Sequence, residues 1–135
     1  LRTSEAWNYD VTLLVELQTA AMRERGEVGE ILSRSNFKYM YWNMAQQIAH
    51  ATVNGTAVRP GDLYASGTIS GPTPDSLGSL IEMTWRGARP IRLKSGEERT
   101  FLEDGDTVTL RGFCEGPGKP RIGFGSVSGT ILPPS

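Results

Sequence analysis

The chain has 135 residues, of which 38% are apolar, and it contains 16 glycines and 8 prolines. Its 14 basic and 15 acidic side chains leave a formal net charge of −1, which excludes a basic footprint for nucleic acid or for an anionic membrane. No apolar run approaches the roughly 20 residues that a membrane-spanning helix needs. We therefore expect a soluble protein that binds neither nucleic acid nor membrane.

Residues 1–135 are expected to form a single unit that is mainly β with one helix. The many glycines and prolines indicate short strands joined by turns, as in a sandwich, barrel or roll. Cys114 is the only cysteine, so an internal disulfide is excluded and a cytoplasmic location is expected. The first residue is leucine, and a strand pattern follows at once, so we expect a fragment of a longer polypeptide.

The N-terminal third is predicted to contain two strands and the helix. Apolar residues alternate with polar ones over residues 7–17, which is typical of a half-buried strand. Residues 19–30 are expected to form a hairpin loop, with a return strand near residues 28–32. Apolar residues then recur at helical spacing over residues 37–51. This pattern predicts a helix that Ser35 caps and Gly55 follows, with its apolar stripe in the core.

Short strands and turns are predicted for the remaining residues. Residues 59–62 suit a type II turn, because a proline and then a glycine occupy its central positions. Strands are expected over residues 63–69 and 79–85, on either side of a loop at residues 70–78 that contains two prolines. Further strands are predicted over residues 90–93, 99–102, 107–114 and 121–132.

Glu82 is a carboxylate in an otherwise apolar predicted strand. Burial without a partner would cost several kcal/mol or make it take up a proton, so an arginine, a histidine or water is expected beside it. Taken alone, the residues favour a salt bridge on the strand face or an edge position. Strand propensity alone likewise explains Thr68.

Other candidate sites have simple structural explanations. His50 is the only histidine, and its place near a predicted helix C-terminus accounts for it through the helix dipole. Glu103, Asp104 and Asp106 do not have EF-hand spacing, and the Asp-Gly pair indicates a solvated turn. No nucleophile motif or dinucleotide-binding loop is complete, and Cys114 is expected to lie in the core.

Four segments resemble the C-terminal part of the fumarylacetoacetate hydrolase family. They are residues 35–42, residues 59–72, residues 78–82 and residues 101–106, supported by residues 46–50 and 53–55. The resemblance runs from about Ser33 to the end and implies the mixed β-sandwich roll of that family's C-terminal domain. It also implies a cytosolic, homodimeric hydrolase that cleaves a carbon–carbon bond of fumarylacetoacetate. The products are fumarate and acetoacetate, in tyrosine and phenylalanine breakdown.

The resemblance assigns roles to two residues of this chain. Glu82 matches the glutamate that holds the catalytic histidine, and Thr68 matches the threonine that hydrogen-bonds substrate. The family's histidine and the carboxylates that bind Mg²⁺ or Ca²⁺ lie upstream, so His50 is not the base and no metal ligand is expected here. The chain alone should therefore be inactive and should need the N-terminal part of the enzyme.

Two alternatives to this function stay open. One is a related keto-acid hydrolase, decarboxylase or hydratase of the same superfamily. The other is a non-catalytic β-rich module for binding or assembly, in which Glu82 and Thr68 are merely structural.

Overall fold

The computed structural model describes residues 8–134, and its main element is a four-stranded sheet with the order β2-β1-β5-β6. These strands are β1 (Thr12–Gln18), β2 (Glu30–Asn36), β5 (Thr107–Gly116) and β6 (Lys119–Thr130). A second sheet pairs β3 (Ile91–Arg92) with β4 (Glu98–Arg99). Every pairing among these strands is antiparallel. The predicted β-rich class is confirmed.

Strand β1 lies between β2 and β5, and it carries the buried centre of the sheet. Leu17 is opposite Glu30 of β2 and Val108 of β5, and it is fully buried. The alternating sequence pattern predicted this strand from residue 7, but the structure begins it at Thr12. Trp7 lies outside the described residues.

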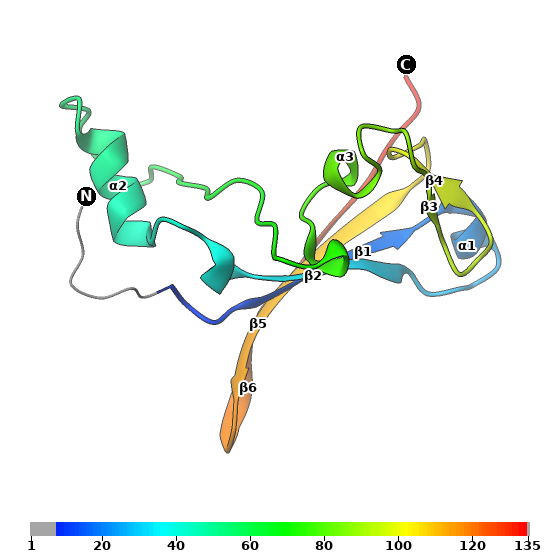
Figure 1. Ribbon diagram of the computed structural model, residues 1–135, viewed down its shortest axis with the longest axis horizontal. Helices are drawn as coiled ribbons and strands as arrows, with labels where there is room; N and C mark the ends of the chain where they lie inside the picture. The colour runs from blue at the N-terminus through cyan, green and yellow to red at the C-terminus, as the bar shows by residue number, and fades with distance from the viewer. Residues whose placement is uncertain (1–7, 135) are drawn as a thin grey trace.

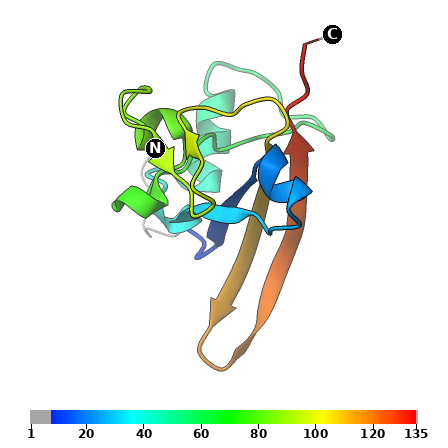
Figure 2. The same cartoon turned by 90° about the vertical axis from the view of Figure 1, so that its right-hand side faces the viewer.

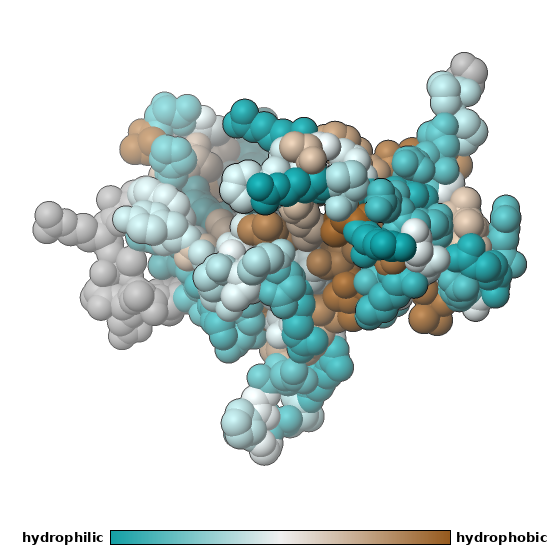
Figure 3. All heavy atoms as spheres, turned by 45° about the vertical axis from the view of Figure 1, so that its right-hand side comes forward, coloured by the Kyte–Doolittle hydropathy of each residue, from teal (hydrophilic) through white to brown (hydrophobic). Residues whose placement is uncertain are grey.

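The β5–β6 hairpin projects away from the other elements (Figures 1 and 2). Its strands agree with the ranges predicted at residues 107–114 and 121–132, to within a few residues. Phe124 and Val127 on β6 are 66% and 64% exposed, and Figure 3 shows apolar side chains at the surface of the molecule. The buried apolar residues among those described are few: Leu17, Met22, Leu93 and Phe113.

A short helix, α1 (Ala20–Glu24), replaces part of the loop predicted after the first strand. Thr19 is its N-cap, and the Thr19 hydroxyl accepts a hydrogen bond of 3.0 Å from the backbone N–H of Met22. Thr19 and Met22 are both buried. A threonine cap followed by two alanines favours a helix over a loop here.

The helix predicted over residues 37–51 is wrong in its start, its cap and its burial. The structure has a 3-10 turn, η1 (Phe37–Tyr39), and then α2 (Met44–Thr52), which begins after Asn43. Asn43 and Gln46 form a reciprocal capping box, and Ser35 lies in β2 instead. No residue of α2 is buried, because α2 stands apart from the sheet (Figure 1).

The two strands predicted around the proline-containing loop are also wrong. Residues 63–69 have no regular secondary structure, and residues 80–83 form the short helix α3 (Leu80–Met83). Another 3-10 turn, η2 (Pro74–Ser76), lies within the loop. Ser79 precedes Glu82 by three residues, which is the spacing of a helix N-terminus, and this local signal outweighs the apolar alternation. In addition, the strands expected near residues 90–93 and 99–102 are only two residues long.

Candidate functional site

Glu82 lies on α3 and is exposed, not on a strand face as predicted. Its Oε2 atom accepts hydrogen bonds of 2.7 Å from the hydroxyl groups of Ser70 and Ser79. These two hydroxyls, Ser70 first, lower the pKa of Glu82, and the backbone N–H groups of Gly78 and Ser79 lower it further. The carboxylate is therefore ionised at neutral pH and is held by neutral donors, not by an arginine.

The loop at residues 70–78 is tied to itself and to the sheet. The backbone N–H of Gly78 donates to Ser70 Oγ at 3.0 Å, and that of Gly71 donates to the carbonyl of Ser76 at 2.7 Å. The Ser33 hydroxyl, from β2, donates to the carbonyl of Leu77 at 2.7 Å. These bonds fix the loop that presents Ser70 to Glu82.

Thr68 packs directly against this loop. A Cβ added at Gly78 would lie 2.6 Å from Thr68 Cγ2 and 2.7 Å from the carbonyl oxygen of Ile69. Only glycine leaves room for this approach. Thr68 is exposed, and it is linked to Glu82 through Gly78 and Ser70. The structure thus brings the two predicted site residues into one connected segment.

An open hollow of about 770 Å³ lies beside Glu82. Its lining residues are Leu77, Ile81, Glu82, Trp85 and Arg86. Trp85 and Arg86 have φ angles of 50° and 57°, which L-residues seldom adopt and which often mark functional segments. The hollow therefore combines a carboxylate, a guanidinium and an exposed indole next to a strained turn.

A second hollow, of about 430 Å³, is lined by Gly67, Ile69 and Gly78 and by residues of the sheet. These sheet residues include members of β1, β5 and β6. It is mostly apolar, so it suits packing more than chemistry.

The other sequence candidates lie elsewhere. His50 is exposed on α2, with its ring centroid 6.4 Å from that of Trp42. Cys114 is a free cysteine of intermediate burial on β5. Within residues 8–134, no group of three or more His, Cys, Asp or Glu side chains is placed to hold a metal ion, and no helix is long and apolar enough to cross a membrane.

Asp106 is not in a solvated turn, as the Asp-Gly pair predicted. It is fully buried and forms an ion pair with Arg99, in which Arg99 Nε lies 2.9 Å from Asp106 Oδ2. The backbone N–H of Glu103 donates to the same oxygen at 3.0 Å. Hydrogen bonding to Asp106 raises the pKa of Arg99. Glu103 and Asp104 are exposed, as expected for a turn.

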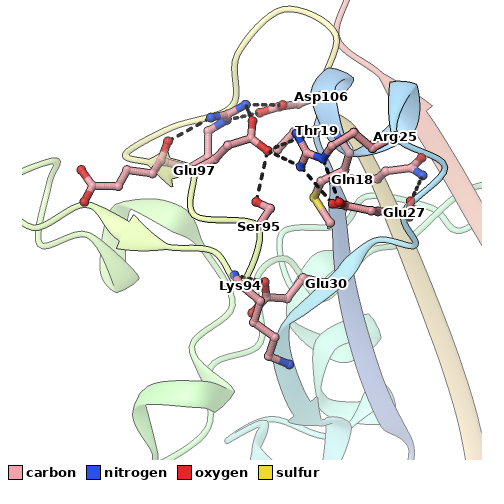
Figure 4. A network of polar contacts seen from close by, with 12 residues as sticks. Gln18, Thr19, Arg25, Glu27, Glu30, Lys94, Ser95, Glu97 and Asp106 are labelled. Atoms are coloured by element: carbon pink, nitrogen blue, oxygen red, sulfur yellow. Dashed lines mark hydrogen bonds and ion pairs between the residues drawn. The ribbon is translucent and has the colours of Figure 1, made fainter.

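Glu97 extends this buried pair into a network (Figure 4). It accepts hydrogen bonds from Thr19 at 2.8 Å and from Ser95 at 3.1 Å. Glu97 also lies 3.5 Å from Arg99 and from Arg25 in ion pairs. The Thr19 hydroxyl is the largest cause of the lowered pKa of Glu97. The network joins the start of α1 to the β3–β4 turn and is structural.

A family model described as "Fumarylacetoacetate (FAA) hydrolase C-terminal" matches residues 7–132. The chain belongs to this family. It is 49% identical over 129 residues to the Homo sapiens fumarylacetoacetase, which covers 96% of this chain and 30% of the relative. The Arabidopsis thaliana fumarylacetoacetase is 47% identical over 133 residues, covering 98% of this chain and 30% of the relative. The chain thus spans about 30% of the length of these curated relatives.

Sequence reasoning missed Ser70 and Ser79 as partners of Glu82. The pattern Ser79-Leu80-Ile81-Glu82 is a capping-box signature, and it would have placed Glu82 on the first turn of a helix, next to Ser79. Nothing local predicts the contact with Ser70, because Ser70 and Glu82 are 12 residues apart and the loop between them decides it.

Proposed function

We propose that this chain is the C-terminal part of a fumarylacetoacetase, which hydrolyses fumarylacetoacetate to fumarate and acetoacetate in tyrosine and phenylalanine breakdown. The observation that carries the proposal is Glu82, an ionised carboxylate held by two hydroxyls. It lies within the residues that the family model covers, in a chain that aligns with fumarylacetoacetases at 47–49% identity over 129–133 residues. The name of those relatives supports the substrate, and the geometry supports the role of the residue.

Glu82 has the chemistry needed to orient an imidazole. In this proposal, a histidine from the rest of the polypeptide donates its ring N–H to Glu82, and its other nitrogen accepts a proton from water. The resulting hydroxide adds to the carbonyl carbon, and the carbon–carbon bond to the acetoacetate unit then breaks. The electron pair of that bond leaves with acetoacetate and takes up the proton that the imidazole accepted from water. Glu82 stabilises the imidazolium and does not itself take the proton.

Thr68 supplies a hydrogen-bonding group to the substrate. Its hydroxyl is on an exposed side chain whose methyl group packs against Gly78. Packing of the methyl group restricts the side-chain rotamer of this β-branched residue. This position suits a binding role better than a catalytic one.

The described residues do not fit a divalent metal, because no cluster of acidic or imidazole side chains converges among them. The Mg²⁺ or Ca²⁺ that we propose for the whole enzyme would take its ligands from the N-terminal part, and it would supply polarisation of the diketo acid. We also place the enzyme in the cytoplasm as a homodimer. These three statements rest on the resemblance to the family.

Glu82→Gln, made in the full-length protein that carries this sequence, tests the function. Fumarylacetoacetate turnover should fall by as much as about 10⁴-fold, the loss seen when the orienting carboxylate of a triad is replaced by its amide. Glu115→Gln, an exposed carboxylate in the β5–β6 hairpin, is the matched control and should leave turnover unchanged. Normal turnover by Glu82→Gln with an unchanged thermal midpoint contradicts the role of Glu82.

The same assay distinguishes the alternatives. Turnover of an acylpyruvate in place of fumarylacetoacetate by the unmodified protein identifies a related keto-acid hydrolase. Absence of turnover on both substrates, with either cation present, favours a non-catalytic module.

A further inference from the structure

Two hydroxyl groups converge on a single oxygen atom of Glu82. Ser70 comes from the start of the loop at residues 70–78, and Ser79 follows the end of that loop. Both hydroxyls lie 2.7 Å from Glu82 Oε2. One carboxylate oxygen has about two acceptor directions, so the two serines fill those of Oε2. The backbone N–H groups of Gly78 and Ser79 also interact with this carboxylate, so a further strong donor such as an imidazole must use the acceptor direction that remains on Oε1.

The hydrogen-bonding direction of the Ser70 hydroxyl is set by the loop. Its oxygen accepts the backbone N–H of Gly78 at 3.0 Å, and its single proton is therefore free to point at Glu82. The backbone of the loop thus sets the direction of the hydroxyl, and the hydroxyl sets the position of the carboxylate. This connection restrains a side chain that is otherwise exposed and mobile.

Ser79 behaves differently from an ordinary helix cap. It is the N-cap residue of α3, but its side chain makes no capping hydrogen bond to the helix backbone. An N-cap serine normally accepts a backbone N–H of the first turn. Here the hydroxyl donates to Glu82 instead. The Ser79 backbone N–H bonds the same carboxylate, as in the glutamate half of a capping box, so Ser79 holds Glu82 through both its backbone and its side chain.

We propose that Ser70 and Ser79 are positioning residues, which hold the Glu82 carboxylate by Oε2 so that Oε1 faces the catalytic imidazole. The inference rests on the proposed function. Neither serine touches the substrate or the reacting water; both act through Glu82. Removing either donor lets the carboxylate rotate, so the imidazole is less well oriented and less often in the productive tautomer.

The two hydroxyls also affect the pH range of activity. They lower the pKa of Glu82, so their removal raises that pKa relative to the unmodified protein. Protonated Glu82 cannot accept the imidazole N–H in the same way or stabilise the imidazolium. The ionisation of Glu82, an acidic step in the kcat/KM profile below the titration of the imidazole base, should therefore move to higher pH in the serine variants.

The first experiment measures kcat, KM and the pH profile of Ser70→Ala and Ser79→Ala in the full-length protein. Each substitution should lower kcat roughly tenfold with little change in KM. A tenfold loss corresponds to the lower end of the energy of one hydrogen bond to a charged group. Ser95→Ala is the matched control, because the Ser95 hydroxyl also donates to a glutamate, Glu97, at 3.1 Å. It should leave kcat and the acidic step unchanged.

The second experiment repeats both substitutions in the Glu82→Gln background. If the serines act through Glu82, the further loss should be much smaller than in the unmodified background. Ser79→Thr keeps the hydroxyl and should restore most of kcat. If Ser70→Ala fails to fold, Ser79→Ala alone carries the same test. The Ser79 hydroxyl does not accept a backbone N–H of the loop, as the Ser70 hydroxyl does, so its removal should disturb the loop less.

The outcomes separate this inference from the function on which it rests. If Glu82→Gln is inactive but both alanine variants match Ser95→Ala, the inference fails and the function stands. The inference also fails if the serine losses are equal in both backgrounds, or if only the thermal midpoint changes. If Glu82→Gln keeps full turnover, the proposed function itself fails.

Discussion

Glu82 and Asp106 are two carboxylates that the same chain holds in opposite ways. Asp106 is fully buried and is paired with the guanidinium of Arg99, which neutralises it and occupies both of its oxygens. Glu82 is exposed, and only hydroxyl and backbone N–H groups, all neutral, stabilise its charge. A carboxylate neutralised in the interior stabilises the fold, whereas one kept charged at a surface beside a hollow is available to another group.

The largest expected effect on stability is the loss caused by removing the structural carboxylate, Asp106. Asp106→Ala leaves Arg99 buried without its closest partner and should lower the free energy of unfolding by about 3–5 kcal/mol. Thermal or denaturant unfolding of the full-length protein measures it. Glu103→Gln removes an exposed partner of the same arginine and should cost less than about 1 kcal/mol. Equal losses of stability for the two variants would contradict the structural role of the buried Arg99–Asp106 pair.

Gly78→Ala tests the loop framework that holds Glu82. The new methyl group must displace Thr68 or the Ile69 carbonyl, at a cost of about 1–3 kcal/mol in stability, and it should also lower turnover. Gly116→Ala is the control, because a Cβ there meets nothing within 4 Å. A fully active Gly78→Ala protein would show that this close approach is not needed by the site.

Thr68→Val tests whether the Thr68 hydroxyl binds the substrate. The substitution keeps the methyl group that packs against Gly78 and removes only the hydroxyl. A roughly threefold to tenfold rise in KM with little change in kcat is expected if the hydroxyl binds substrate. A fall in kcat at unchanged KM would instead give Thr68 a role in the chemical step.

Glu97→Gln should have the smallest effect and should depend on pH. The pKa of Glu97 is lowered in the folded state, first by the Thr19 hydroxyl, so its stabilisation is complete above the ordinary glutamate pKa of about 4.3. That stabilisation is lost as the pH falls through the lower, folded-state pKa. The difference in thermal midpoint between the two proteins should therefore be present at pH 7 and vanish in acid. A constant difference would contradict this origin.

The longest strands, β1, β5 and β6, were predicted well from residue alternation and turn residues. The predictions failed where side-chain caps compete with the apolar pattern. The alternation along β1 and the turn between β5 and β6 fixed those elements to within a few residues, apart from the N-terminal end of β1. The apolar spacing over residues 37–51 suggested one continuous helix, but Asn36 and Asn43 each start a separate turn. Side-chain caps act over three residues and can override a longer periodic pattern.

For the candidate site, the sequence proposed two residues, whose roles stay predictions, and it did not predict their geometry. Glu82 and Thr68 were singled out from the sequence and its family resemblance, and the structure places them in one connected segment. Their surroundings were wrong, because α3 takes the place of a predicted strand and an exposed position takes the place of a buried one. An arginine was one expected partner of Glu82, but the buried carboxylate that pairs with an arginine, Arg99, is Asp106.

The sequence by itself determined the β-rich class, the main hairpin and the family, because these depend on periodicity, turn residues and local motifs. It also singled out Glu82 and Thr68 as candidate site residues. Only the tertiary structure decided which carboxylate is buried with a cation and which is exposed and held by serines. Arg99 reaches Asp106 across a turn, and Ser70 reaches Glu82 across a loop. Such contacts depend on where the loops pack, which no short stretch of residues encodes on its own.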